Sequence, residues 1–174
     1  MLERIVLGLG SNKGLSDEME FEPVQILKMA VIELQKIFLP KDFFYSSVYK
    51  SKAMYYEDQS DFFNMVVSGF YDGTPQELLH QINEIEANFG RNRLNEFRNG
   101  PRTLDIDIEL FGEKIVSDAN LEIPHKKIKE RQFVLIPLLE IFPKCAEPIS
   151  GVLFSDILAK LPDQGVEFFC KLDL

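Results

Sequence analysis

The chain has 174 residues, of which 45% are hydrophobic and 27% charged, as in ordinary globular domains large enough to bury a core. Its net charge of -9 at pH 7 excludes the broad basic surface that nucleic acid or an anionic membrane would require. We therefore expect neither as a partner. Cys145 and Cys170 lie far apart and outside any metal-ligand spacing, so we expect reduced thiols.

The beginning of the sequence predicts neither a signal peptide nor a membrane span. Its apolar run, Ile5 to Leu9, follows the acidic Glu3 and is too short for the apolar region of a signal peptide. No segment approaches the length needed to cross a bilayer. We expect a single domain over residues 1–174, present in the cytoplasm as a monomer.

The first elements predicted are a strand and a helix. Arg4 to Gly10 is typical of a strand buried on both faces, and its glycines allow a ligand or another backbone to come close. Lys13 to Glu22 is polar and acidic, which predicts an exposed loop or a leading helical turn. After Pro23, apolar residues recur at helical spacing as far as Phe38, and Pro40 ends the pattern.

Two strands and a second helix are expected next. The strands are Phe43 to Lys50 and Asp61 to Tyr71, and the loop between them, Ser51 to Ser60, is long enough to be a binding loop. Thr74 to Glu77 combines a threonine cap, a proline at the first helical position and a glutamate that completes a capping box. Gly90 ends the helix that follows.

A strand with one chemical face is predicted between Thr103 and Leu110. Polar and apolar residues alternate strictly, and the apolar set is expected to point inward: Leu104, Ile106, Ile108 and Leu110. Asp105 and Asp107 then project from the opposite face, with Cα atoms roughly 6 to 7 Å apart. Such a pair suits Mg²⁺, which typically uses one or two carboxylates together with substrate phosphates and water.

The simplest alternative for Asp105 and Asp107 is an acidic strand face in contact with water. A calcium loop is a weaker alternative, because Leu110 stands where such a loop needs glycine. The arginines favour a phosphate site instead. Five of the six lie between positions 91 and 131: Arg91, Arg93, Arg98, Arg102 and Arg131. Arginine suits bidentate phosphate contacts, so acids and arginines together indicate metal-assisted transfer from a nucleoside triphosphate.

The remaining elements complete the predicted fold. A short excursion returns at Leu121 to Ile123, and a helix follows from residue 129 or 130 to Phe142, shortened or kinked at Pro137. Ser155 and Asp156 predict the cap of a short helix that ends at Leu161, and Val166 to Leu172 predicts an edge strand. The order of elements favours an α+β fold, a ferredoxin-like βαββαβ antiparallel sheet in an α/β/α sandwich, with a cleft near Asp105.

Several unlike motifs, in one order, resemble the 6-hydroxymethyl-7,8-dihydropterin pyrophosphokinase family of folate biosynthesis. The resemblance runs from Ile5 to about Pro143. The motifs are Leu9-Gly10-Ser11-Asn12, Phe63-Asn64, Glu86 through Gly90-Arg91-x-Arg93, Gly100-Pro101-Arg102-Thr103-Leu104-Asp105-Ile106-Asp107, Ile123-Pro124-His125 and Arg131-x-Phe133-x-Leu135-x-Pro137-Leu138.

The resemblance implies a reaction and a set of site residues. The reaction is transfer of the β,γ-pyrophosphoryl group of ATP to the hydroxymethyl group of 6-hydroxymethyl-7,8-dihydropterin, with release of AMP. Asp105 and Asp107 are implied as ligands of two Mg²⁺ ions, with Arg91 and Arg102 as phosphate clamps. Contacts to ATP are implied for Arg93, His125 and Arg131. Contacts to the pterin are implied for Met54, Phe62, Asn64 and Phe133.

Some positions depart from the family pattern. Ser51-Lys52 stands where a Thr-Pro pair is usual, Asn99 replaces a tryptophan, and Lys126 replaces an aromatic residue. Two other kinds of function stay open at this point. One is a metal-dependent nucleotidyl or glycosyl transferase, which also uses paired aspartates. The other is a ferredoxin-like module that binds a ligand without turnover, since a fold alone does not fix a function.

Overall fold

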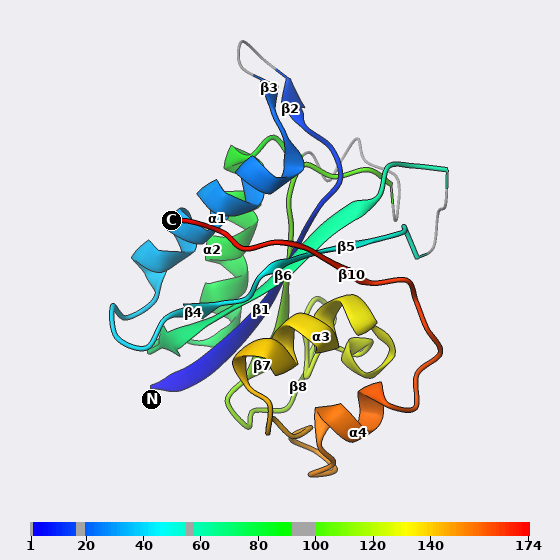
Figure 1. Ribbon diagram of the computed structural model, residues 1–174. Coiled ribbons are helices and arrows are strands. Elements are labelled where there is room, and N and C mark those ends of the chain that lie inside the picture. Colours follow the sequence, from blue (N-terminus) through cyan, green and yellow to red (C-terminus); the bar gives the residue numbers. More distant parts are fainter. Residues whose placement is uncertain (1, 17–19, 55–57, 92–99) are drawn as a thin grey trace.

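The computed structural model describes residues 2–16, 20–54, 58–91 and 100–174. In this part of the chain an antiparallel sheet has the order β10-β5-β6-β1-β7, with β4 beside β6 (Figure 1). Its strands are β1 (Glu3–Ser11), β4 (Phe44–Tyr45), β5 (Val48–Ser51), β6 (Phe62–Tyr71), β7 (Asp105–Phe111) and β10 (Glu167–Cys170). The order β5-β6-β1-β7, with two helices in the connections, confirms the ferredoxin-like arrangement.

Helices cover both faces of the sheet and complete an α/β/α sandwich (Figure 1). On one face lie α1 (Pro23–Ile37) and α2 (Pro75–Asn88), and on the other α3 (Gln132–Ile141) and α4 (Phe154–Leu158). The larger core lies beneath α1 and α2, where buried side chains from both helices pack on inward residues of β1, β6 and β7. A smaller core lies beneath α3 and α4. No helix of the described residues is both long enough and apolar enough for a membrane span.

The start of α2 follows from local chemistry, as predicted. The backbone N–H of Glu77 donates to the hydroxyl of Thr74, and the Glu77 carboxylate accepts from the backbone N–H of Thr74 at 2.7 Å. Pro75 occupies the first position, where its missing N–H has no partner to lose. The helix predicted after Pro23 is also confirmed and ends at Ile37.

The structure differs from the prediction at Lys13 to Glu22. There β2 (Leu15–Ser16) pairs with β3 (Glu20–Phe21), so the segment contains a short antiparallel pair rather than a helical turn. A second short pair, β8 (Val116–Ser117) with β9 (Glu122–Ile123), accounts for the excursion after β7.

The strand predicted from Phe43 to Lys50 is divided into β4 and β5. At the break the Ser46 hydroxyl accepts a hydrogen bond from the backbone N–H of Val66, and Ser47 donates from its N–H and its hydroxyl to Glu140 of α3. These side-chain hydrogen bonds compete with the regular strand ladder. Where the strand is interrupted, Ser47 therefore docks α3 on the sheet, while Ser46 bonds to β6.

The C-terminal helices also differ in their limits. A 3₁₀ turn, η1 (Ile128–Glu130), precedes α3, and Arg131 has an extended backbone between the two. The last helix starts at Phe154, before the predicted cap at Ser155, and ends at Leu158. Phe154 is fully buried in the smaller core, so packing rather than side-chain capping sets this boundary. The predicted edge strand is confirmed as β10, which pairs with β5.

A β-bulge in β7 changes the predicted side-chain pattern. Val6 of β1 pairs with Leu110, whereas Leu7 pairs with Ile108, so that Glu109 is an extra residue. Beyond the bulge the alternation is reversed, because the extra residue turns the following side chains to the opposite faces. Leu110 therefore packs in the smaller core with Val6, not with Leu104, Ile106 and Ile108 as predicted.

Candidate active site

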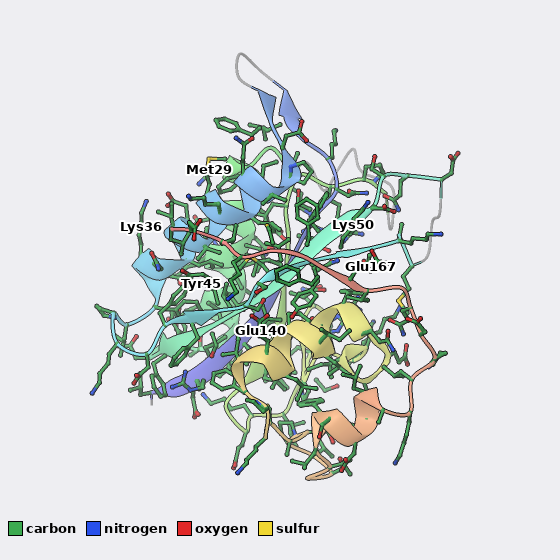
Figure 2. All side chains as sticks on the ribbon, viewed as in Figure 1. Met29, Lys36, Tyr45, Lys50, Glu140 and Glu167 are labelled. Atoms are coloured by element: carbon green, nitrogen blue, oxygen red, sulfur yellow. The ribbon has the colours of Figure 1, made fainter. Side chains whose placement is uncertain are left out.

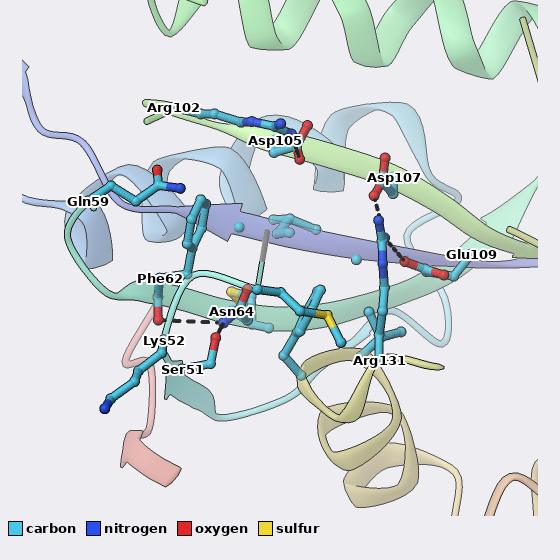
Figure 3. Close-up of a pocket in the computed structure, with 17 residues that line it drawn as sticks. Ser51, Lys52, Gln59, Phe62, Asn64, Arg102, Asp105, Asp107, Glu109 and Arg131 are labelled. Carbon is cyan, nitrogen blue, oxygen red and sulfur yellow. Dashed lines mark hydrogen bonds and ion pairs between the residues drawn. The ribbon is translucent and has the colours of Figure 1, made fainter. Parts of the chain in front are cut away.

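A pocket lies beside the edge of β7, between the sheet and the start of α3 (Figure 3). It draws side chains from β1, β5, β6, β7 and α3, and from the loop between β5 and β6. Its polar lining includes Asn64, Arg102, Asp105, Asp107, Glu109 and Arg131. The strand predicted to carry the chemistry thus forms one wall of a cavity.

Asp105 accepts two guanidinium groups at one end of this wall. The Nη1 of Arg91 lies 2.5 Å from Oδ1 of Asp105, and Arg102 donates to Oδ2. Burial alone would raise the pKa of Asp105, but Arg102 and Arg91 together hold it below its ordinary value. Asp105 is therefore ionised and paired with two guanidinium groups, and the same two groups could bind a phosphate.

Arg91 is itself held from behind by Glu86 of α2. The guanidinium donates to Oε1 of Glu86, and the same oxygen accepts the backbone N–H of Ile106 at 2.8 Å. The Glu86 side chain is 1% exposed and that of Arg91 is 9% exposed. Glu86 thus ties α2 to β7 and aims Arg91 at Asp105.

Asn12, at the end of β1, fixes the approach to Arg102. Its Oδ1 accepts the backbone N–H of Arg102 at 2.8 Å, while its Nδ2 donates to Oε1 of Gln59 at 2.9 Å and to the carbonyl of Ser60 at 3.1 Å. One buried amide therefore joins the segment before β7 to the loop before β6. The loop predicted to bind ligand is anchored at this end.

At the other end of the wall, Asp107 and Glu109 face Arg131 and His125. Arg131 Nη1 donates to Oδ2 of Asp107 at 2.8 Å and lies 3.8 Å from Oε1 of Glu109 (Figure 3). His125 lies between the same two carboxyls, with Nε2 3.9 Å from Asp107 and Nδ1 3.8 Å from Glu109. Burial lowers the pKa of His125, although the charge of Asp107 opposes this shift. Burial, reinforced by Asp107, raises the pKa of Glu109 well above its ordinary value.

The opposite wall offers an amide and aromatic rings. Asn64 of β6 is buried and donates from Nδ2 to the Ser51 hydroxyl at 3.0 Å. Phe62 and Phe133 line the same cavity. At Gly10 a side chain would meet Oδ1 of Asn64 at 3.4 Å, so glycine leaves the amide accessible. This wall suits a flat, polar-edged ring.

Comparison with known proteins identifies the group to which this site belongs. Residues 6–143 match the family model described as 7,8-dihydro-6-hydroxymethylpterin-pyrophosphokinase (HPPK). The chain belongs to the HPPK family.

Similar proteins include chains of comparable length and longer ones. The 2-amino-4-hydroxy-6-hydroxymethyldihydropteridine pyrophosphokinase of Aquifex aeolicus is 38% identical over 146 residues, which are 83% of this chain and 84% of the relative. The Pseudomonas aeruginosa enzyme of the same name is 33% identical over 167 residues, 96% of this chain and 97% of the relative. The folic acid synthesis protein fol1 of Pneumocystis carinii is 32% identical over 165 residues, but the match spans only 21% of its length.

Solved structures agree at the level of the fold. A triple mutant of Plasmodium falciparum HPPK-DHPS, crystallised with pteroate, superposes with a TM-score of 0.65 at 15% identity. The match covers 92% of this chain and 43% of the Plasmodium chain. A second Plasmodium falciparum HPPK-DHPS mutant, crystallised with SDX-DHP, has a TM-score of 0.63 at 17% identity.

The structure brings most of the predicted HPPK site residues together. Asp105, Asp107, Arg102 and Arg131 line the pocket with the four predicted pterin contacts, Met54, Phe62, Asn64 and Phe133. Arg91 and His125 lie directly behind this lining, against the two aspartates. Arg93 lies outside the described residues, as does Asn99.

Sequence reasoning gave no role to Glu109, Asn12 or Glu86. Glu109 continues the alternation of Asp105 and Asp107, which is the one signal that could have drawn attention to it. Asn12 and Glu86 fall within motifs of the family resemblance, but their partners lie far away in sequence: Asn12 bonds Arg102, 90 positions on. Only the folded chain shows these contacts.

The carboxylates of this HPPK pocket fit the binding of Mg²⁺. Asp105 and Asp107 project from the same face of β7 into the cavity, and each one is paired with a cation, Asp105 with Arg91 and Arg102, Asp107 with Arg131. Among the described residues no cluster of three or more acidic, histidine or cysteine side chains forms a complete metal cage. The two aspartates are the kind of donor set that Mg²⁺ favours, since this ion typically uses one or two carboxylates and completes its octahedron with phosphate and water oxygens.

Proposed function

We propose that this chain transfers the β,γ-pyrophosphoryl group of ATP to the hydroxymethyl group of 6-hydroxymethyl-7,8-dihydropterin. The products are the pterin diphosphate and AMP, within tetrahydrofolate biosynthesis. The observation that carries the proposal is a single pocket with two ends of different chemistry. Paired aspartates and arginines lie at one end, and a buried amide with aromatic rings lies at the other.

The acidic end suits a polyphosphate. Asp105 and Asp107 would hold two Mg²⁺ ions, which would neutralise charge on the transferring group and on the leaving phosphate. Once Asp105 binds metal, Arg91 and Arg102 have donors available for phosphate oxygens, for which the planar guanidinium is well shaped. Arg93, His125 and Arg131 are proposed to complete the ATP contacts.

The aromatic end suits the pterin. Asn64 offers its Oδ1 as an acceptor to the ring edge, and the hydrogen bonds from Nδ2 to Ser51 and to the carbonyl of Phe62 fix its orientation. Phe62 and Phe133 line the cavity where the flat ring would stack, with Met54 at the rim. Ser51, which departs from the family pattern, thus orients Asn64.

A direct test is pterin-dependent formation of AMP from ATP in the presence of Mg²⁺. We expect one AMP and one pterin diphosphate per turnover, and no AMP when either the pterin or Mg²⁺ is withheld. Incorporation of nucleotide into the product would instead indicate nucleotidyl transfer. Binding of both ligands without AMP would indicate a non-catalytic module.

We propose in addition that the protein is a cytoplasmic monomer. Two free cysteines, both half-buried, fit a reducing compartment. Light scattering on the purified chain tests the monomer directly, and a mass of twice 20.1 kDa would contradict it.

A further inference from the structure

Glu109 is a buried carboxyl group of the pocket that makes no side-chain hydrogen bond within the described residues. Its side chain is 0% exposed, and neither Oε1 nor Oε2 has a hydrogen-bond partner there. Buried polar groups are nearly always satisfied, and one that is not calls for a physical reason. Asp105, Asp107 and Glu86, by contrast, all accept hydrogen bonds from arginines.

The fold makes a specific place for this carboxyl. Glu109 is the extra residue of the β7 bulge, and its backbone carbonyl accepts the N–H of His125 at 3.0 Å. Its side chain lies over Gly8 of β1, where a Cβ atom would stand 2.9 Å from Oε1. Any residue larger than glycine at position 8 would displace the carboxyl from the pocket wall.

Arg131 lies between Asp107 and Glu109 (Figure 3). Its Nη1 is 2.8 Å from Oδ2 of Asp107 and 3.8 Å from Oε1 of Glu109. A metal ion on Asp107 would compete with the guanidinium for that carboxylate, because two cations cannot approach one oxygen closely without strong repulsion. Nη1 of Arg131 would then lose this acceptor, and Oε1 of Glu109 lies 3.8 Å away, about 1 Å farther than Asp107 is now.

We propose that Glu109 is a positioning residue that accepts Arg131 when Asp107 binds a metal ion. The inference rests on the proposed function, in which Asp107 is a ligand of Mg²⁺. Arg131 has five N–H donors, so one edge of the guanidinium can bind Glu109 while the others face phosphate. The role does not depend on the protonation of Glu109, because either form offers an oxygen lone pair to Arg131.

Two variants of similar length test this role. Glu109→Gln keeps an oxygen acceptor for Arg131, and Glu109→Met removes it while filling the same space. Affinity for a non-hydrolysable ATP analogue is measured by calorimetry, first with saturating Mg²⁺ and then in EDTA. With Mg²⁺ we expect about tenfold weaker binding for Glu109→Met and a change below about twofold for Glu109→Gln. In EDTA, Asp107 keeps Arg131, and the two variants should bind like the wild type.

A double-mutant cycle with Arg131→Ala gives the second readout. In that background Glu109→Met should cause no further loss of affinity with Mg²⁺, because the group it positions is gone. Urea unfolding of the metal-free proteins serves as the control for packing, and Glu109→Leu replaces Glu109→Met if the latter does not fold.

Three results would overturn the role of Glu109. They are equal affinities of Glu109→Met and wild type with Mg²⁺, a loss of the same size in EDTA, or a loss that persists without Arg131. A wild-type protein that does not bind the analogue with Mg²⁺ would overturn the proposed function as well. Normal wild-type binding with an unaffected Glu109→Met variant would overturn this role alone.

Discussion

At the scale of single residues, Asp105 stabilises the fold in addition to its proposed role as a ligand of Mg²⁺. It pairs with Arg91 and Arg102, so Asp105→Asn leaves two guanidinium groups near a neutral amide. We expect turnover to be abolished and the free energy of unfolding to fall by about 2 kcal/mol, because a partly buried charge pair is broken. Asp107 has one hydrogen-bonded arginine, and its side chain is 35% exposed. Asp107→Asn should therefore abolish turnover as well, but lower the free energy of unfolding by less than Asp105→Asn does.

AMP assays and urea titrations on both variants check this expectation. Near-normal turnover in either one would contradict the assignment of the aspartates. Equal destabilisation would show that the pairing with Arg91 contributes nothing.

Arg91 and Arg102 should differ in what their loss does to stability and to ATP binding. Arg91 is 9% exposed and pairs with the buried Glu86, so Arg91→Ala should lower the free energy of unfolding by about 3 kcal/mol. Arg102 is 20% exposed, and its partner Asp105 keeps Arg91, so Arg102→Ala should change stability by less than about 1 kcal/mol while weakening ATP binding. Arg91→Lys is the matched control, because it retains the charge. Unfolding curves that coincide for the two alanine variants would contradict the structural role of Arg91.

At the scale of elements, Glu140 joins α3 to the sheet near β5 (Figure 2). It accepts hydrogen bonds from Ser47 and from the Tyr49 hydroxyl, the latter at 3.0 Å. Burial, together with Glu140, raises the pKa of Tyr49 to about 12. An unfolded tyrosine titrates near 10, so between these pH values the unfolded chain binds fewer protons than the native one, and stability falls as pH rises.

We therefore expect the free energy of unfolding to decrease less with rising alkaline pH in Tyr49→Phe than in the wild type. Urea unfolding at about pH 9 and about pH 11.5 should show a smaller decrease for Tyr49→Phe than for the wild type. Tyr45→Phe, on the exposed face of the neighbouring β4, is the matched control. If stability decreases as steeply in Tyr49→Phe as in the wild type, the hydrogen bond between Tyr49 and Glu140 does not contribute to the pH dependence of stability.

At the scale of the whole molecule, the pocket couples elements that are otherwise separate. It draws on β1, β5, β6, β7 and α3, so a ligand bound there should oppose unfolding of the whole domain. A non-hydrolysable ATP analogue with Mg²⁺ at 100 times its Kd should stabilise by about 2.7 kcal/mol. For a domain of this length we expect a rise in Tm of roughly 5 to 10 °C. Differential scanning calorimetry measures it, with EDTA and Asp105→Asn as controls, and an unchanged Tm at that saturation would contradict binding to the folded pocket.

The sequence by itself determined the order of the main elements, the cap of α2 and the presence of two aspartates on β7. These features depend on near neighbours: the alternation in Thr103 to Leu110 follows from the two-residue period of a strand, and the start of α2 follows from Thr74 and Glu77. The clustering of five arginines indicated a phosphate site. The family resemblance added the role of each arginine and the pterin contacts, which have no local periodicity of their own.

Only the tertiary structure decided how the side chains are paired. The bulge that buries Glu109 arises where β7 meets β1, and Arg131 reaches Asp107 across 24 positions because α3 packs on β5 and β6 and begins at the pocket. Likewise, Ser46 and Ser47 divide a predicted strand because Val66 and Glu140 offer them partners. Such contacts join residues distant in sequence, and their energies depend on burial and on the positions of other elements. A local sequence pattern contains no information on burial or on the positions of other elements. The acceptor for each arginine in this pocket is therefore fixed by the fold.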